Sequence, residues 1–130
     1  MNQEQYSANI LIVDDQEPNV RLLQKILSGA GYSNVIATTN PLEVEKLHRE
    51  HDFDLVLLDI RMPEMDGFEA TGVWREKEQT SSKRRLPIIA MTANVMAGDR
   101  EKCLASGMDD YLGKPVRQAE LGKVLQRWIK

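Results

Sequence analysis

Five side chains able to do chemistry stand at the ends of apolar segments in this 130-residue sequence. They are three carboxylates, one hydroxyl and one ammonium group: Asp14, Asp15, Asp59, Thr92 and Lys114. Neighbouring carboxylates repel one another unless a cation joins them. Their oxygens suit Mg²⁺, which keeps several waters and binds through one or two carboxylates and a phosphate oxygen. The set therefore indicates a site for Mg²⁺, or for Mn²⁺ in its place.

The apolar segments that carry these residues are typical of strands. Each is short and continuous, as in strands that are buried on both faces of a sheet. We expect strands at 10–13, 35–37, 55–58, 88–91 and 111–112, with an amphipathic helix after each. This alternation predicts a parallel sheet with helices on both faces. Sites in such sheets lie outside the carboxyl ends of the strands, so the five side chains are expected to converge there.

Several residues have simpler explanations than chemistry. An acid after a strand, taken alone, is more simply a helix cap, and only its recurrence at several strand ends favours a site. His48 and His51 lie one helical turn apart; a metal pair or a phosphorylatable histidine is the alternative, but we expect a solvated helix face. The basic run 83–85 is expected to be a solvated loop rather than a nucleic-acid patch.

Two helices carry details that the structure can test. Asn40 is expected to cap the second helix, with the carboxylate of Glu43 reaching back to it as in a capping box. In the helix before the last strand, Cys103 and Leu104 are expected to face the core.

Composition narrows the class of protein. The chain is 42% hydrophobic and 28% charged, which predicts one globular domain, placed at 9–130 after a polar segment 1–8. A net charge of −3 argues against nucleic acid as a partner. No apolar run is long enough to span a membrane, and the polar start has no signal core, so we expect no membrane attachment of its own. A single cysteine favours the cytoplasm.

Four segments, in this order, resemble the motifs of response-regulator receiver domains in two-component and phosphorelay signalling. They are Asp14-Asp15, Leu57–Gly67, Thr92-Ala93 and Tyr111–Pro115. The resemblance runs from about Ile10 to Lys130 and implies a flavodoxin-like, doubly wound (βα)5 fold with five parallel strands in the order 2-1-3-4-5. The segment 90–103 is similar to the receivers of hybrid sensor histidine kinases.

The resemblance implies a role for each site residue. Asp59 would be the phosphoacceptor, whose carboxylate forms an acyl phosphate. Asp15 and Asp59 would bind Mg²⁺ directly and Asp14 through a water, while the backbone carbonyl of Arg61 would add another oxygen. Lys114 would pair with a phosphoryl oxygen.

The remaining implied roles concern switching and rate. Thr92 would donate its hydroxyl to a phosphoryl oxygen, and Tyr111 would then swing from an exposed rotamer into the vacated space. The surface of the fourth helix, fifth strand and fifth helix would change with it. Arg61 and Asn94 would tune how fast water attacks the phosphoryl group. The Lys114–Pro115 peptide is expected to be cis.

The implied partner is a histidine kinase or a histidine phosphotransfer domain, with an unassigned downstream partner. We expect a phosphoacceptor limited to self-phosphorylation and autodephosphorylation, not an enzyme with an external substrate. Two other classes stay open on this fold: a haloacid dehalogenase-type hydrolase and a nucleotide- or flavin-binding domain. The first expects Asp-x-Asp after the first strand, where this sequence has adjacent Asp14-Asp15. Free-standing receiver, relay intermediate and piece of a longer or engineered chain all remain open, although the chain ends with its last helix and no output domain is expected.

Overall fold

A parallel sheet of five strands forms the centre of the computed structural model, which describes residues 7–40, 43–51, 53–59, 71–76, 86–92, 99–114 and 116–129. The strands are β1 (Ile10–Val13), β2 (Val35–Thr38), β3 (Leu55–Asp59), β4 (Ile88–Thr92) and β5 (Asp110–Gly113). Their order is β2-β1-β3-β4-β5, and every neighbouring pair is parallel. The predicted fold class and strand order are therefore confirmed.

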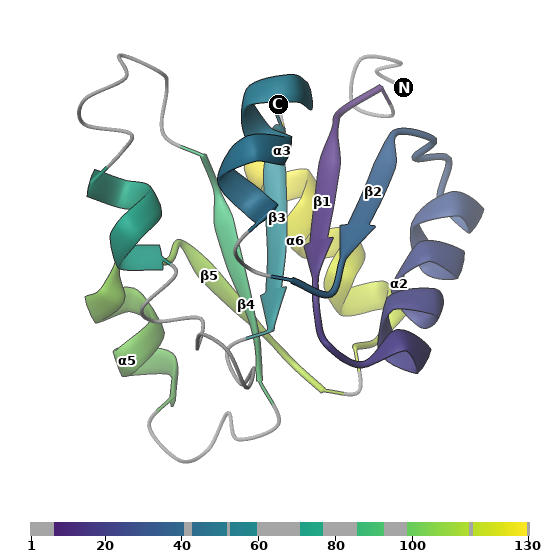
Figure 1. Ribbon diagram of the computed structural model, residues 1–130. Helices are drawn as coiled ribbons and strands as arrows, with labels where there is room; N and C mark the ends of the chain where they lie inside the picture. Colours follow the sequence, from purple (N-terminus) through teal and green to yellow (C-terminus); the bar gives the residue numbers. More distant parts are fainter. Residues whose placement is uncertain are drawn as a thin grey trace.

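Helices cover both faces of this sheet (Figure 1). The labelled helices are α2 (Glu17–Gly29), α3 (Val44–His51), α5 (Asp99–Ser106) and α6 (Gln118–Trp128), and a further helix lies at 71–76. One core cluster joins the sheet to α2 and α6 through residues such as Leu23 and Leu121. The other joins the opposite face to α3 and the helix at 71–76 through Val44 and Trp74. The continuous apolar strands are thus explained by burial on both faces.

The end of α2 shows why glycine stands after this helix. Gly31 has a φ of 102°, a left-handed conformation that glycine adopts without steric cost. Its N–H donates to Ser28 O at 3.1 Å, and the N–H of Tyr32 donates to Leu27 O at 3.0 Å. Tyr32 then packs into the core, 4% exposed. The buried Tyr32 therefore anchors the end of α2 in the same core cluster that joins this helix to the sheet.

Two of the local predictions on helices are wrong. The backbone N–H of Asn40, which Glu43 was expected to accept, donates instead to Thr38 Oγ1 at 3.1 Å, and the same hydroxyl contacts Glu43 Oε1 at 3.0 Å. The buried threonine therefore takes the place of Glu43 as acceptor of the Asn40 N–H. Leu104, expected to face the core, is 46% exposed because α5 presents this position to solvent.

His48 also differs from its prediction as part of a solvated helix face. It is half-buried, and its Nδ1 accepts the backbone N–H of Phe53 at 3.0 Å. Its ring stacks on that of Phe53 with centroids 6.1 Å apart. His48 thus ties α3 to Phe53, which lies beyond the end of this helix, a role that its spacing from His51 does not indicate.

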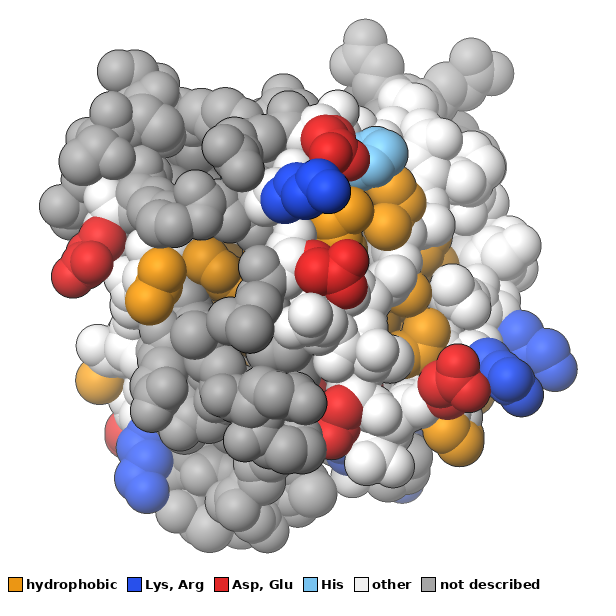
Figure 2. Space-filling model, in the orientation of Figure 1, with side chains coloured by type: hydrophobic (Ala, Val, Ile, Leu, Met, Phe, Trp, Pro, Cys, Tyr) orange, Lys and Arg blue, Asp and Glu red, His pale blue; other side chains and the backbone are white. Residues whose placement is uncertain are grey.

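Charged side chains of both signs are interspersed over the described part of the face that Figure 2 displays. Among the described helices, none combines the length and the hydropathy needed to cross a lipid bilayer.

Candidate functional site

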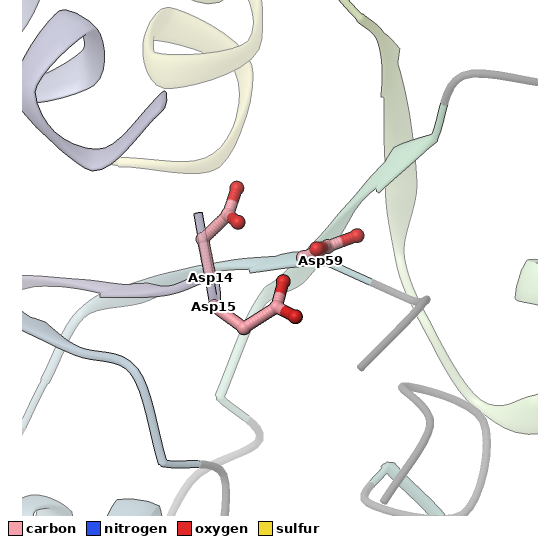
Figure 3. A group of neighbouring side chains, drawn as sticks. All are labelled: Asp14, Asp15 and Asp59. Carbon is pink, nitrogen blue, oxygen red and sulfur yellow. The ribbon is translucent and has the colours of Figure 1, made fainter. Parts of the chain in front are cut away.

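The strand register brings the first two acidic positions together. Val13 pairs with Leu58, so Asp14 follows β1 beside Asp59 at the end of β3. The backbone N–H of Asp14 continues the ladder to Thr38 O at 3.2 Å, which fixes where its side chain starts. Carboxylate oxygens of Asp14, Asp15 and Asp59 lie within 4.8 Å of one another (Figure 3). The predicted convergence of the three acids is what the fold produces.

Lys114, which directly follows the outermost strand β5, brings a positive charge to this cluster. Its N–H donates to Thr92 O at 2.8 Å, which extends the β4–β5 ladder by one residue. Its ammonium then lies 3.2 Å from Asp59 Oδ1 and 3.3 Å from Asp14 Oδ2. Among the described residues, three carboxylates against this one ammonium leave two negative charges in excess. The cluster is therefore electrostatically suited to a divalent cation.

Asp14 is surrounded by donors from α2 and β5. Its Oδ1 accepts the backbone N–H of Gln16 at 2.9 Å, an Asx turn that leads into the first turn of α2. Its Oδ2 accepts the side-chain amide of Asn19 and also faces Lys114. The side chain of Asp14 is 0% exposed, so these contacts compensate a fully buried charge.

Asp15 has the opposite environment. Its Oδ1 is buried and, among the described residues, has no hydrogen-bond partner. A buried carboxylate oxygen is costly when nothing compensates its charge, and a cation beside it removes that cost. The donor set fits Mg²⁺, because Asp15 offers an uncommitted oxygen near Asp59 while Asp14 is already held by protein donors.

Thr92 and Tyr111 lie on β4 and β5, the two strands that continue the sheet beyond β3. Met91 pairs with Asp59, and Thr92 follows it as the last residue of β4, 1% exposed. Ala90 pairs with Tyr111, so alternation places Thr92 and Tyr111 on one face. Tyr111 is half-buried and packs against the core on that face. Tyr111 is therefore less exposed than the starting position expected for it.

Three predicted site residues, Arg61, Asn94 and Pro115, lie outside the described residues. Conversely, Asn19 contacts the cluster without having been singled out from the sequence. The available signal was its position five residues after Asp14, within the first turn of a helix that starts at the carboxyl ends of the strands. An asparagine there is ordinary by helix propensity, so only the folded geometry shows its contact.

Comparison with known proteins gives a consistent family. A family model for the response regulator receiver domain matches residues 10–126. The sensor protein GacS of Pseudomonas syringae pv. syringae is 40% identical over 119 residues, which are 92% of this chain and 13% of that protein. The chain thus spans a small part of such a relative.

Two solved structures resemble the whole described fold. The receiver domain of sensor histidine kinase PA1611 from Pseudomonas aeruginosa, solved with a magnesium ion in its active site cleft, is 41% identical with a TM-score of 0.80, covering 95% of this chain and 98% of that one. The Saccharomyces cerevisiae Ssk1 receiver domain, co-crystallised with the histidine phosphotransfer protein Ypd1, is 32% identical with a TM-score of 0.83, covering 95% and 89%. With its sheet order, its acidic cluster and these matches, the chain belongs to the response regulator receiver domain family of two-component and phosphorelay signalling proteins.

Proposed function

We propose that Asp59 is the phosphoacceptor of this receiver domain and that Lys114 and Thr92 act beside it. The observation that carries the proposal is the position of Asp59 Oδ1, 3.2 Å from the ammonium of Lys114 and within the acidic cluster at the end of β3. A carboxylate in this setting is a positioned nucleophile beside a fixed positive charge. The side chain of Asp59 is 5% exposed, so little water competes for it.

The donor is a phosphohistidine of a kinase or a phosphotransfer protein. A carboxylate oxygen of Asp59 forms the new P–O bond as the P–N bond to the imidazole breaks, and the leaving nitrogen keeps the electron pair and takes up a proton. Lys114 balances the charge that gathers on one phosphoryl oxygen, and the hydroxyl of Thr92 donates to another. The reaction depends mainly on positioning and charge neutralisation, which these groups supply.

A divalent cation would be held directly by Asp15 and Asp59, with Asp14 contacting it through a water and the Arg61 carbonyl completing the ligands. When bound, it neutralises negative charge on the phosphoryl oxygens and on the carboxylates. The unpartnered Oδ1 of Asp15 and the magnesium-containing relative PA1611 both support this assignment. Mn²⁺ fits the same oxygen donors.

The co-crystal of the Ssk1 receiver with Ypd1 supports a histidine phosphotransfer domain or a histidine kinase as the partner of this chain. We place the receiver unit at 9–130 and its work in the cytoplasm, as the single cysteine favours. It acts as a phosphoacceptor rather than as an enzyme with its own substrate. The hydrolase and flavin alternatives gain no support from relatives that are named as sensor kinases.

The switch would run through Thr92 and Tyr111, which share one face of β4 and β5. Because Tyr111 already packs against that core, its movement would be a repacking between two half-buried positions rather than a burial from solvent. Arg61 and Asn94 would tune the lifetime of the acyl phosphate.

The test is incubation with acetyl phosphate and Mg²⁺ followed by mass measurement of the intact protein. We expect one phosphoryl group per chain in the wild type and none in Asp59→Asn, since an amide is a poor nucleophile. Asp54→Asn is the matched control, because Asp54 precedes β3 at the opposite edge of the sheet. Phosphorylation of Asp59→Asn at the wild-type rate, with peptide mapping excluding a neighbouring acid, would contradict the assignment. Turnover of phosphomonoesters would instead indicate the hydrolase.

A further inference from the structure

Asn19 connects the first turn of α2 to the acidic cluster. Its side-chain Nδ2 donates to Asp14 Oδ2, the oxygen that also faces the ammonium of Lys114 at 3.3 Å. Its backbone N–H donates to Gln16 O at 3.0 Å, and the N–H of Gln16 donates to Asp14 Oδ1 at 2.9 Å. The start of α2 therefore holds both oxygens of Asp14, while Lys114 approaches one of them from β5.

The two partners of Asp14 Oδ2 differ in what phosphorylation does to them. Lys114 lies between Asp14 and Asp59, at 3.3 Å and 3.2 Å, so its ammonium is shared. A phosphoryl group on Asp59 adds negative oxygens that compete for this ammonium. Asn19 is neutral and belongs to α2, so its hydrogen bond to Asp14 does not depend on where Lys114 goes.

The burial of Asp14 makes this difference matter. Its side chain is 0% exposed, and a buried carboxylate that loses a charged partner pays a penalty unless other donors remain. With Asn19 and the Gln16 N–H in place, Asp14 keeps a donor on each oxygen after Lys114 has left. Without Asn19, Oδ2 would depend on Lys114 alone among the contacts that the described residues make with it.

We propose that Asn19 is a positioning residue that keeps Asp14 satisfied and thereby releases Lys114 to the phosphoryl group. The inference rests on the proposed function, since it assigns the release of Lys114 to phosphorylation at Asp59. Asn19 touches neither the cation nor the phosphoryl oxygens in this scheme and acts through Asp14 only. Its removal strengthens the hold of Asp14 on Lys114 and so weakens the phosphorylated state relative to the unphosphorylated one.

The test compares Asn19→Ala with the wild type in two titrations at a temperature well below unfolding. One measures the affinity for Mg²⁺ alone by calorimetry, and the other the affinity for beryllofluoride, a phosphoryl mimic, at saturating Mg²⁺. We expect beryllofluoride to bind about 10-fold more weakly, equivalent to one hydrogen bond to a charged group. The Mg²⁺ affinity should change by less than about 3-fold, because Lys114 need not leave Asp14 for the cation to bind.

Asn9→Ala is the matched control. Asn9 is also half-buried and also donates one side-chain amide, to His51 O at 3.0 Å, but at the opposite edge of the sheet. This variant should unfold more readily while both affinities stay unchanged. A loss of beryllofluoride affinity in Asn9→Ala equal to that in Asn19→Ala would show that general destabilisation is the cause and would overturn the proposal.

A second comparison uses Lys114→Ala as the background. If Asn19 acts by releasing Lys114, adding Asn19→Ala to Lys114→Ala has no further effect on beryllofluoride affinity, and full additivity overturns the proposal. Equal losses of Mg²⁺ and beryllofluoride affinity in Asn19→Ala also overturn it, because they assign Asn19 to the cation site. The proposed function fails separately, if the wild type itself neither binds beryllofluoride nor takes a phosphoryl group at Asp59.

Discussion

Acidic and basic side chains meet both at the amino ends of the strands (the amino edge) and at their carboxyl ends (the carboxyl edge), but with different results. At the amino edge, Arg75 and Asp109 form an ion pair at 2.7 Å, with side chains 12% and 9% exposed. Arg75 also donates to the carbonyls of Gly107 and Leu86, each at 2.9 Å, and Asp109 accepts the N–H of Ile88 at 2.9 Å. Charge and hydrogen bonding are both balanced there.

At the carboxyl edge the same balance is missing. Asp14 and Asp59 share the ammonium of Lys114, and Asp15 Oδ1 has no hydrogen-bond partner among the described residues. The excess charge is compatible with the folded state because the buried strands β1 and β3 hold the acids in place. The comparison teaches that a charged group with all its partners in the protein stabilises the fold, whereas a charged cluster that lacks partners is a candidate ligand site.

The largest effect is expected from breaking the amino edge. Arg75→Met should lower the free energy of unfolding by about 3 kcal/mol, because it leaves a largely buried carboxylate without its charged partner. Urea denaturation measures the loss. Arg21→Met is the control, since the Arg21–Glu17 pair is 3.7 Å apart with side chains 77% and 73% exposed, and it should cost under about 0.5 kcal/mol. Equal losses in the two variants would remove the contrast between the edges.

The next effect comes from filling the carboxyl edge. Mg²⁺ at 100 times its dissociation constant should raise the free energy of unfolding by about 2.7 kcal/mol, as for any ligand that binds only the folded state. Asp15→Asn should lose most of this gain, because Asp15 has a buried oxygen that accepts no hydrogen bond from the described residues. Urea midpoints with and without Mg²⁺ provide the comparison. A variant stabilised as much as the wild type would mean that Asp15 is not a ligand.

A smaller effect separates the two neighbouring acids. In metal-free, low-salt buffer, Asp15→Asn should raise the free energy of unfolding by about 1 kcal/mol, since it relieves repulsion without removing a described hydrogen bond. Asp14→Asn should not, because it gives up the charge that pairs with Lys114. Thermal melts of both variants decide the order. Greater stability of Asp14→Asn would show that repulsion outweighs its contacts.

These differences also show what could be predicted from the sequence. The strands and the meeting of Asp14, Asp59 and Lys114 follow from apolar segments and from one rule about strand ends. The order of the strands was implied by the resemblance to receiver domains. The Arg75–Asp109 pair escaped prediction because it joins residues 34 apart in the sequence, and an arginine in a helix is usually solvent-exposed.

Side-chain partners within a site were equally hard to predict. The contact of Asn19 with Asp14 and the exposure of Leu104 depend on how each helix is rotated against the sheet. Hydrophobic periodicity sets that rotation only to within a residue or so, which is too coarse to assign one hydrogen bond. The prediction of a solvated His48 was wrong because its partner is the backbone N–H of Phe53, which lies beyond the end of α3.

The smallest effect adjusts the amino edge without touching its charges. Gly72 lies in the helix that carries Arg75, and an added Cβ would meet no atom within 4 Å. Gly72→Ala should therefore raise the free energy of unfolding by about 0.5–1 kcal/mol through helix propensity alone. Gly107→Ala is the contrasting variant, because its φ of +108° and the nearby Arg75 side chain oppose a Cβ. A gain in stability for Gly107→Ala would contradict the packing around the ion pair.

The contact between Lys114 and Asp14 has a consequence for the time course of folding. The two residues are 114 − 14 = 100 positions apart, so the ion pair closes a loop that spans most of the chain. Such a long-range contact forms only after β5 has docked beside β4, late in any order of assembly that begins with local contacts. A nascent chain still emerging from the ribosome carries the acids long before it carries the lysine. If Lys114 pairs with the phosphoryl group as proposed, a chain gains the ability to hold that group only once its last strand has docked.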